Sequence, residues 1–344
     1  MALNFNELML PVPRTAVFKQ NGFHVWCGSM VEGEQHRYYL FYSRWPKALG
    51  HFAWVTHSEV AYAVSDHPLG PYQYAGIALK GSGGERWDAC TVHNPTVLKI
   101  GSKYYMYYMG TKGKSVFGGK PSMQDPDWWE YRNNQRVGVA VADHPAGPWY
   151  KADKPCIDVT PGSFDHLMTS NPTAAQGPDG RIYMVYKAVG DGPKPKGGAV
   201  ICGVAVAKHP LGPFVKQAAP IMINPANEWS VEDPYIWVQN DRFYALVKDF
   251  QGYFTGRGKA TIALFESIDG MHWEASLNPF AFKREICWED GTVEPVEALE
   301  RPQLWLDNGV PAVLFCAVAA DAERDCSFNV HIPLLRESPS ITRS

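Results

Sequence analysis

The sequence predicts an all-β chain folded as a five-bladed β-propeller, with four antiparallel strands in each blade. Three segments, 60–74, 137–151 and 202–216, each contain an alternating Ala/Val strand, the turn His-Pro-x-Gly-Pro and an aromatic strand. A degenerate copy lies at 260–275, and every copy follows a pair of strands. A fifth pair at 299–318 leads into a last strand. Five such units at the spacing of propeller blades predict this architecture.

The repeated turn is typical of a hairpin connection. Its two prolines fix φ, and its glycine permits a positive φ. In the degenerate copy an Asp-Gly turn takes the same place. The strands on either side of each turn are therefore expected to run antiparallel.

The inner strand of each blade is expected to begin near one equivalent position. These positions are Cys27, Asn94, Asn171, Asp233 and Arg301, which lie 67, 77, 62 and 68 residues apart. We expect one domain over 1–344, with an N-terminal segment that adds an outer strand to the last blade. The expected blades cover approximately 22–80, 86–156, 164–222, 228–278 and 296–336. Two β-sandwiches would also give short strands at regular spacing, but they would not repeat one internal order five times.

Composition and charge restrict the classes of partner. The chain has a formal net charge of −3 and no basic run, so we expect no nucleic-acid partner. It has 12 Trp, 17 Tyr and 16 Phe, which suit both a core and a surface that stacks on sugar rings. No stretch approaches the ~20 apolar residues of a membrane span.

The cysteines and the first residues predict an intracellular protein without a bound metal. Seven cysteines are dispersed and include no Cys-x-x-Cys pair, which argues against a disulfide framework and a structural zinc site. We expect no cofactor and no metal ligand set. The first residues lack a basic segment followed by an apolar core, so the expected location is the cytoplasm. A leader removed from this sequence would change that expectation to the periplasm or secretion.

The blade geometry predicts where a site would lie. The first strand of a blade lines the central channel, and it starts on the face where the antiparallel second strand ends. Side chains at these two places should converge on one mouth of the channel. The candidates are Trp26, Arg44, Trp45, Asp88, His93, Asn94, Asp165, Asn171, Lys187, Glu232, Lys248, Glu300 and Arg301.

Two of these candidates belong to a repeated motif. An aromatic-Asp pair precedes Asn-Pro-Thr in two blades, so that Asp88 lies six residues before Asn94, and Asp165 six before Asn171. Duplication at one offset favours a function for both carboxyl groups. A structural repeat would produce the same duplication.

The order of these motifs resembles the five-bladed propeller glycoside hydrolases, broadly family 43 and its relatives, families 117, 32 and 62. Those enzymes have Asp-Pro at the start of inner strands, second strands like "YYLFYS" at 38–43, and turns like "GPW" at 147–149. In family 43 an Asp entering blade one is the base, an Asp entering blade three tunes the acid, and a Glu entering blade four is the general acid. The resemblance implies that Glu232, in "VEDPYIW", is the acid.

The other two positions depart from the family pattern. Cys27 in blade one and Asn171 in blade three stand where family 43 has Asp. Either Asp88 and Asp165 supply the missing carboxylates, or the chemistry differs. As a general acid, Glu232 would need a raised pKa, which burial against an apolar wall would provide.

The remaining candidates suggest how a sugar would be held. Four cations from four blades (Arg44, Lys187, Lys248 and Arg301) suit an anionic sugar, such as a uronic acid or a sulfated sugar. The alternative is that they brace the protein's own carboxylates. Trp26 and Trp45 are candidates for stacking on the sugar, and His93 for a hydrogen bond to a hydroxyl or a proton shuttle. Trp128 and Trp129 lie in a long insertion, 112–135, that is expected to form a lid at the rim.

The sequence therefore predicts a glycoside hydrolase that cleaves a terminal sugar from an oligosaccharide or polysaccharide fragment, the sugar being acidic if the cations face it. Its expected partner is a carbohydrate. Two alternatives keep the sugar site. One is a carbohydrate-binding propeller without catalysis, and the other is a glycoside phosphorylase whose phosphate would occupy the cationic ring.

Overall fold

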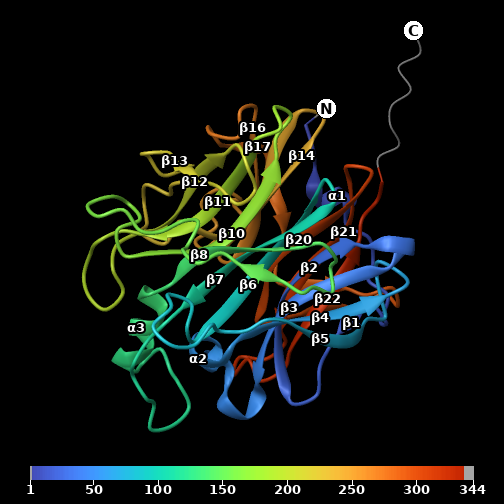
Figure 1. The fold of residues 1–344 in the computed structure, drawn as a ribbon. Helices are drawn as coiled ribbons and strands as arrows, with labels where there is room; N and C mark the ends of the chain where they lie inside the picture. The colour runs from blue at the N-terminus through green and yellow to red at the C-terminus, as the bar shows by residue number, and fades with distance from the viewer. Residues whose placement is uncertain (1, 337–344) are drawn as a thin grey trace.

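Five antiparallel sheets of four strands are arranged as a propeller, as Figure 1 shows. The structure is a computed structural model that describes residues 2–336, so the domain expected over 1–344 extends past the described residues at both ends. The inner strands contact one another in cyclic order, which places them around one axis. The predicted fold class is confirmed.

Each of the first four sheets follows the chain from an inner to an outer strand. The first sheet contains β2 (Phe23–Glu32), β3 (Tyr38–Pro46), β4 (Glu59–Ser65) and β5 (Gln73–Leu79). The second contains β6 (Thr91–Ile100), β7 (Lys103–Thr111), β8 (Arg136–Ala142) and β9 (Tyr150–Lys151). The third contains β10 (Met168–Gln176), β11 (Ile182–Val189), β12 (Val200–Ala207) and β13 (Val215–Lys216). The fourth contains β14 (Val231–Gln239), β15 (Arg242–Asp249), β16 (Thr261–Ser267) and β17 (Glu274–Phe282).

The fifth sheet joins the two ends of the chain. It contains β20 (Ala298–Asp307), β21 (Val310–Ala319), β22 (Ser327–Pro333) and, as its outer strand, β1 (Val17–Phe18). In this pairing Val17 lies opposite Val330 and Phe18 opposite Asn329. The last blade is therefore completed by the N-terminal segment.

Few elements lie outside these sheets. They are a ribbon of β18 (Glu285–Cys287) and β19 (Val293–Pro295), the helices α1 (Phe5–Leu8), α2 (Trp54–His57) and α3 (Pro126–Asn133), and 3-10 turns at Glu34–His36, Lys47–Leu49 and His51–Ala53. None of the helices in residues 2–336 has the length and apolar character needed to cross a membrane.

The histidines of the repeated turn have a local role. In each copy Nδ1 of the histidine accepts a hydrogen bond from a backbone N–H two residues later: Leu69 to His67, Ala146 to His144 and Leu211 to His209. The His144 ring also packs edge-on against Tyr39 of the preceding blade, at 5.7 Å between centroids. These histidines therefore stabilise the turn and the junction between blades.

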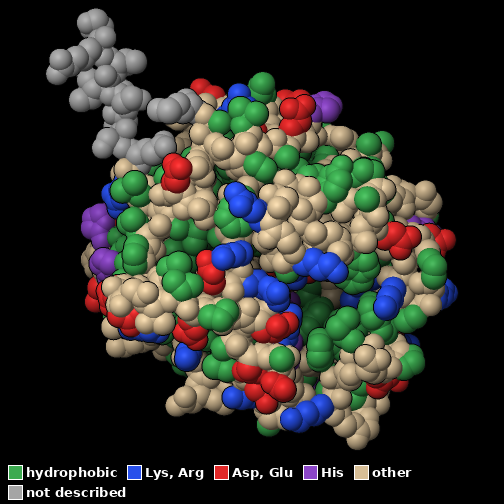
Figure 2. Space-filling model, turned by 180° about the vertical axis from the view of Figure 1, so that it is seen from behind, with side chains coloured by type: hydrophobic (Ala, Val, Ile, Leu, Met, Phe, Trp, Pro, Cys, Tyr) green, Lys and Arg blue, Asp and Glu red, His purple; other side chains and the backbone are tan. Residues whose placement is uncertain are grey.

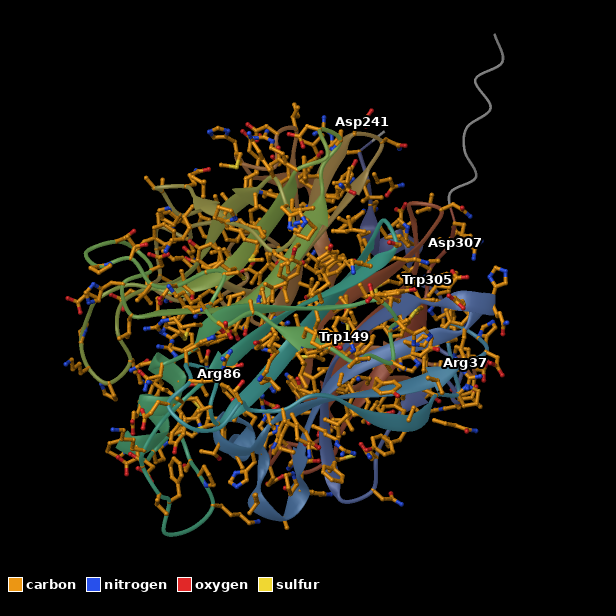
Figure 3. The ribbon with its side chains drawn as sticks, viewed as in Figure 1. Arg37, Arg86, Trp149, Asp241, Trp305 and Asp307 are labelled. Carbon is orange, nitrogen blue, oxygen red and sulfur yellow. The ribbon has the colours of Figure 1, made fainter. Side chains whose placement is uncertain are left out.

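Hydrophobic side chains fill the junctions between neighbouring blades. Trp149 packs edge-on against Phe41 of β3 at 5.5 Å, and Trp305 of β20 against Tyr38 at 5.4 Å. Trp149 and Trp305 are labelled in Figure 3. Burial of one large apolar side chain stabilises a fold by roughly 1.5–3 kcal/mol. Because each blade buries both faces in this way, its strands are hydrophobic along much of their length.

A β-bulge occurs at the same point of every inner strand. The pairing shifts between Trp26 and Ser29, His93 and Thr96, Ser170 and Thr173, Glu232 and Tyr235, and Glu300 and Gln303. The bulges contain Cys27, Asn94, Asn171, Asp233 and Arg301, whose φ angles lie between 47° and 57°. Asn and Asp adopt this left-handed conformation more readily than most residues do, which accounts for three of the five. The inner strands begin two to four residues before these positions.

Candidate active site

The five bulged residues join their side chains around the axis. Cys27 Sγ donates to Asn94 Oδ1, Asn94 Nδ2 donates to Asn171 Oδ1 at 2.7 Å, and Asn171 Nδ2 donates to Asp233 Oδ1 at 2.7 Å. Arg301 Nη1 donates to Asp233 Oδ1 at 3.3 Å, and the charge of Arg301 lies close enough to Cys27 to act on the pKa of its thiol. We call these five residues the axial ring. Cys27 and Asn171, which stand where family 43 has Asp, are thus hydrogen-bonding members of one ring.

A pocket of about 350 Å³ lies against the axial ring and is lined by residues from all five blades. Asn94, Asn171, Asp233 and Arg301 of the ring contribute to its lining. Its volume falls in the range of small-molecule sites, about 300–1,000 Å³. Figure 2 shows a hollow in one face of the molecule, where Lys and Arg side chains gather beside hydrophobic ones.

Part of the pocket wall is aromatic. Its rings belong to Trp26, Trp45, Phe52, Trp54, Trp128, Trp129 and Trp229. Trp54 of α2 packs edge-on against Trp128 of α3 at 5.6 Å, and Trp128 Nε1 donates to the carbonyl of Phe52 at 3.0 Å. The two tryptophans expected in a lid are thus packed into the wall. Trp26 and Trp45 also line the pocket, as predicted, but they are only 6% and 0% exposed, whereas Trp54 is partly exposed.

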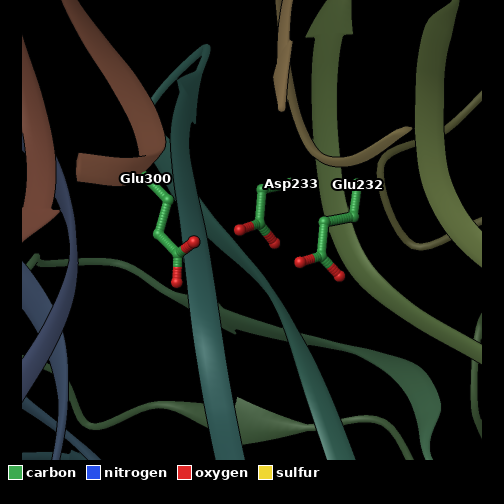
Figure 4. Close-up of side chains that lie close together, drawn as sticks. All are labelled: Glu232, Asp233 and Glu300. Carbon is green, nitrogen blue, oxygen red and sulfur yellow. The ribbon is translucent and has the colours of Figure 1, made fainter. Parts of the chain in front are cut away.

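Three carboxyl groups lie side by side in the pocket (Figure 4). One oxygen from each of Glu232, Asp233 and Glu300 lies within 4.8 Å of the others. Each group has a cationic partner. Glu232 pairs with Lys187 at 2.6 Å and with Lys248 at 3.1 Å. Glu300 pairs with Lys248 and with Arg324 at 3.5 Å, and Asp233 pairs with Arg301. Three of the four predicted cations therefore lie at the site and neutralise carboxylates.

The adjacent carboxyl groups of Glu232 and Asp233 have opposite pKa shifts. Burial alone would raise the pKa of Glu232, but the charges of Lys187 and Lys248 outweigh it and hold the pKa below its usual range. Burial, and then the negative charge of Glu232, raise the pKa of Asp233 to about 6 against the opposing charge of Arg301. The expected raised pKa of Glu232 is therefore wrong, and of these two carboxyl groups Asp233 is the one whose pKa lies closer to neutral.

The carboxyl cluster does not suit a divalent cation. Carboxylate oxygens are good ligands for hard cations such as Ca²⁺. Here, however, Lys187, Lys248, Arg301 and Arg324 already contact these oxygens. A metal ion would have to displace these cations or lie next to them, and like charges in a buried site repel strongly.

Two neutral imidazoles also line the pocket. His93 shares a hydrogen bond between Nδ1 and Ser58 Oγ at 2.7 Å, and its ring stacks on Trp54 at 5.0 Å. Burial lowers the pKa of His93 well below its usual value and that of His51 to about 3. Both side chains are thus uncharged near neutral pH. Since Nδ1 is the ring nitrogen that Ser58 engages and His93 lines the pocket, Nε2 can hydrogen-bond a ligand hydroxyl.

Asp88 and Asp165 lie outside the pocket lining. Asp88 accepts hydrogen bonds from Tyr108 Oη at 3.0 Å and Lys151 Nζ at 2.9 Å, and Arg86, labelled in Figure 3, lies 3.7 Å away. Asp165 is held in the same way by Tyr186 at 3.0 Å and Lys216 at 2.6 Å. Lys151 and Lys216 lie on the outer strands β9 and β13, so each Asp links the segment that precedes the inner strand of its blade to the outer strand of the same blade. The prediction that these residues supply the missing catalytic carboxylates is corrected by this geometry.

Arg44 also lies outside the pocket lining. Its Nε donates to Glu59 Oε1 at 2.9 Å, and its guanidinium lies over the rings of Phe23 and Tyr74 at 4.3 and 4.6 Å. A guanidinium with these partners has no free face for a sugar. Its predicted place among the substrate-binding residues is therefore corrected.

Several pocket residues were not predicted from the sequence. They include His51, Trp54, Arg132, Gln135 and Arg324. All lie in connections outside the repeated strands, so the spacing of the repeat does not predict their positions. The length of the insertion 112–135 was the one signal that pointed toward Arg132 and Gln135.

The described lining has more cations than carboxylates. The cations are Arg132, Lys187, Lys248, Arg301 and Arg324, and the carboxylates are Glu232, Asp233 and Glu300. The site is therefore positive even when all three carboxyl groups are ionised. It can offer a ligand stacking surfaces, hydrogen-bond donors and, below a pH of about 6, the protonated carboxyl group of Asp233.

Comparisons with known proteins identify the fold. No family model and no curated protein matches the chain. A family 117 glycoside hydrolase from the marine bacterium Zobellia galactanivorans matches with a TM-score of 0.63 and 21% identity over 96% of this chain and 91% of its own. The solved complex of BT0996 with RGII matches with a TM-score of 0.68 and 15% identity over 98% and 94%.

A third solved structure is that of a family 43 β-xylosidase/α-arabinofuranosidase from a compost microbial metagenome, in complex with xylotriose and in a calcium-free form. It matches with a TM-score of 0.55 and 14% identity over 99% of this chain and 96% of its own. These likenesses confirm the resemblance in fold. The chain is a five-bladed propeller of the kind found in structures of family 43 and family 117 glycoside hydrolases.

Proposed function

We propose that the protein is a glycoside hydrolase that removes a terminal, acidic sugar from an oligosaccharide or polysaccharide fragment. The observation that carries the proposal is the pair of Asp233 and Glu232, whose pKa values are shifted in opposite directions. Glycoside hydrolysis needs one carboxyl group that donates a proton and one that stays ionised. The likeness in fold to glycoside hydrolases, one of them in complex with xylotriose, supports the proposal.

In this proposal Asp233 donates the proton to the leaving oxygen. Its Oδ1 accepts the hydrogen bonds from Asn171 and Arg301, which leaves Oδ2 for the pocket. Glu232, held ionised by Lys187 and Lys248, stabilises the positive charge at the anomeric carbon, and Asp233, once it has given up its proton, accepts a proton from the attacking water. Glu232 thereby takes the carboxylate role, in place of the acid role that the resemblance implied.

Size and charge support the choice of substrate. A pocket of about 350 Å³ is near the lower limit of small-molecule sites, which suits one terminal sugar better than a long segment of polymer. Tryptophan rings in the wall can stack on a sugar face. The excess of cations over carboxylates in the lining favours a sugar with an acidic substituent.

The test compares two variants on two kinds of substrate. We expect Asp233→Asn and Glu232→Gln each to lower the turnover of acidic oligosaccharides by about 10²–10⁴-fold, the range for loss of a proton-transfer group. An aryl glycoside with a good leaving group needs little protonation, so it should restore the turnover of Asp233→Asn more than that of Glu232→Gln. Equal losses on both substrates would contradict the assigned roles.

A glycoside phosphorylase is the second candidate, because the same cations could bind inorganic phosphate. Formation of a sugar phosphate that depends on added phosphate would select it. If the wild type binds sugars without any turnover, with or without phosphate, the pocket belongs to a carbohydrate-binding propeller without catalysis.

A further inference from the structure

The insertion 112–135 brings a cation into the pocket that has no carboxylate partner. Arg132 lies in the last turn of α3 and is 4% exposed. Its Nη1 donates to the carbonyl of Lys196 and to Asn133 Oδ1, both at 2.9 Å. Within residues 2–336 it forms no ion pair, whereas Lys187, Lys248, Arg301 and Arg324 in the same lining each pair with a carboxylate.

A buried charge without a partner is costly to the fold. Burial lowers the pKa of Arg132 to about 10, although the charge of Glu232 opposes the shift. Arg132 therefore stays ionised near neutral pH. Its guanidinium lies over the ring of Trp129 at 5.5 Å, and this contact restricts the orientation of the guanidinium plane. The structure thus holds a charged, oriented group of donors at the pocket.

A second donor lies on the same insertion. Gln135 lines the pocket and is 2% exposed, and its Nε2 has no hydrogen-bond partner. Buried side-chain donors are nearly always paired, so an unpaired one calls for an acceptor that the protein itself does not provide. Arg132 and Gln135 are three residues apart in sequence. Arg132 Nη1 already donates to two protein oxygens, so a ligand would bind at its remaining N–H donors and at Gln135 Nε2.

We propose that Arg132 and Gln135 bind an oxyanion substituent of the sugar, either the carboxylate of a uronic acid or a sulfate ester. This inference rests on the proposed function. A guanidinium binds such groups through two parallel N–H donors. Lys187, Lys248 and Arg301 brace the protein's own carboxylates, so recognition of the acid comes from the insertion and not from the inner strands.

Calorimetric titration tests this site without requiring turnover. The ligands are galacturonate, galactose 6-sulfate and galactose, together with the pair glucuronate and glucose. The proteins are the wild type, Arg132→Met and a matched control, Lys114→Met, which removes an exposed cation of the same insertion that is not in the pocket lining. We expect Arg132→Met to weaken the acidic ligands by at least about 30-fold, as for truncation of one partner of a buried charge pair.

The neutral sugars should bind Arg132→Met and the wild type alike, and Lys114→Met should behave as the wild type throughout. The acidic ligand whose affinity falls in Arg132→Met, a uronate or the sulfated sugar, identifies the oxyanion that the site binds. If Arg132→Met does not fold, Arg132→Lys keeps the charge and loses the fork, and should weaken the acidic ligands selectively. A wild type that does not prefer any acidic sugar over its neutral partner, or variants that weaken both alike, would overturn the inference.

The same titrations, together with a hydrolysis assay of the wild type and Arg132→Met, separate this inference from the proposed function. Binding of an acidic sugar that depends on Arg132, without hydrolysis of any glycoside, would leave the oxyanion site standing and remove the hydrolase. Hydrolysis of neutral sugars alone, unaffected by Arg132→Met, would leave the hydrolase and remove the oxyanion site.

Discussion

The environments of two adjacent residues decide which carboxyl group of the pocket holds a proton. Glu232 contacts two lysines, while Asp233 contacts one arginine and shares its buried position with the negative charges of Glu232 and Glu300. Their intrinsic pKa values differ by less than one unit, so the difference comes from the partners. The chemistry of the site is set at this level.

The first prediction concerns the pH dependence of the proposed activity. If protonated Asp233 is the acid, kcat/KM should fall as the pH rises through about 6, the pKa of this group. The charge of Glu300 helps to raise that pKa. Glu300→Gln removes this charge, so it should move the alkaline limb of the profile to lower pH. A limb that stays in place would show that another group donates the proton.

At the scale of the element, the same bulge in five strands explains both the shape of the site and the departures from the family pattern. A residue with positive φ in each inner strand turns its side chain toward the axis, where it can reach its neighbour in the next blade. Cys27, Asn94 and Asn171 act as neutral members beside Asp233 and Arg301. The ring therefore needs only one carboxylate for its one guanidinium.

The second prediction tests this account of the axial ring. Asn171→Asp places a carboxyl group where Asn171 Nδ2 now donates to Asp233 Oδ1 at 2.7 Å. Two carboxylates at this distance cannot both ionise at low cost, so the folded state raises the pKa of the pair above that of the unfolded chain. Stability from such a group is present at low pH and is lost as the pH rises through the raised pKa.

Urea unfolding measures this effect. Relative to the wild type, Asn171→Asp should lose more free energy of unfolding at pH 8 than at pH 5. Asn171→Ser removes the same hydrogen bond without adding an ionisable group; only the pKa of Asp233 responds to the lost donor, so its loss should change with pH less than that of Asn171→Asp. A pH-independent loss in Asn171→Asp would mean that the two side chains separate.

At the scale of the whole molecule, the repeat explains how much could be predicted. Five copies of one strand order predicted the propeller, and the register of the inner strands predicted that Glu232, Lys248 and Arg301 meet at one mouth. Which of these charges pair depends on distances between blades, and those distances cannot be predicted from the repeat in the sequence. The raised pKa therefore belongs to Asp233, against expectation.

The failures of prediction have the same origin. Asp88 lies in a repeated motif, but the lysine that binds it comes from the outer strand β9, 63 residues later. Arg132 lies in an insertion that occurs in one blade and has no counterpart in the repeat. A repeat describes what the blades share, whereas the proposed specificity depends on what one blade adds.

Closure of the propeller gives the last prediction. The fifth sheet is completed by β1, whose Phe18 is 4% exposed and packs edge-on against Tyr42 of the first blade at 4.8 Å. This ring therefore joins the last blade to the first at the junction where the chain closes on itself. Phe18→Ala should lower the free energy of unfolding by about 3–5 kcal/mol, the usual cost of truncating a buried Phe.

Tyr150→Ala provides the matched control for Phe18→Ala, since Tyr150 also lies on a two-residue outer strand, β9, but is 65% exposed. A surface substitution of this kind usually changes stability by no more than about 0.5 kcal/mol. Both variants can be compared by urea unfolding at one pH. A small, equal loss in both would mean that the pairing of β1 with β22 adds little, and that the propeller is held together by the other four junctions. A large loss for Phe18→Ala alone would make the N-terminal strand an energetic part of the fold, because the inter-blade core at this junction depends on it.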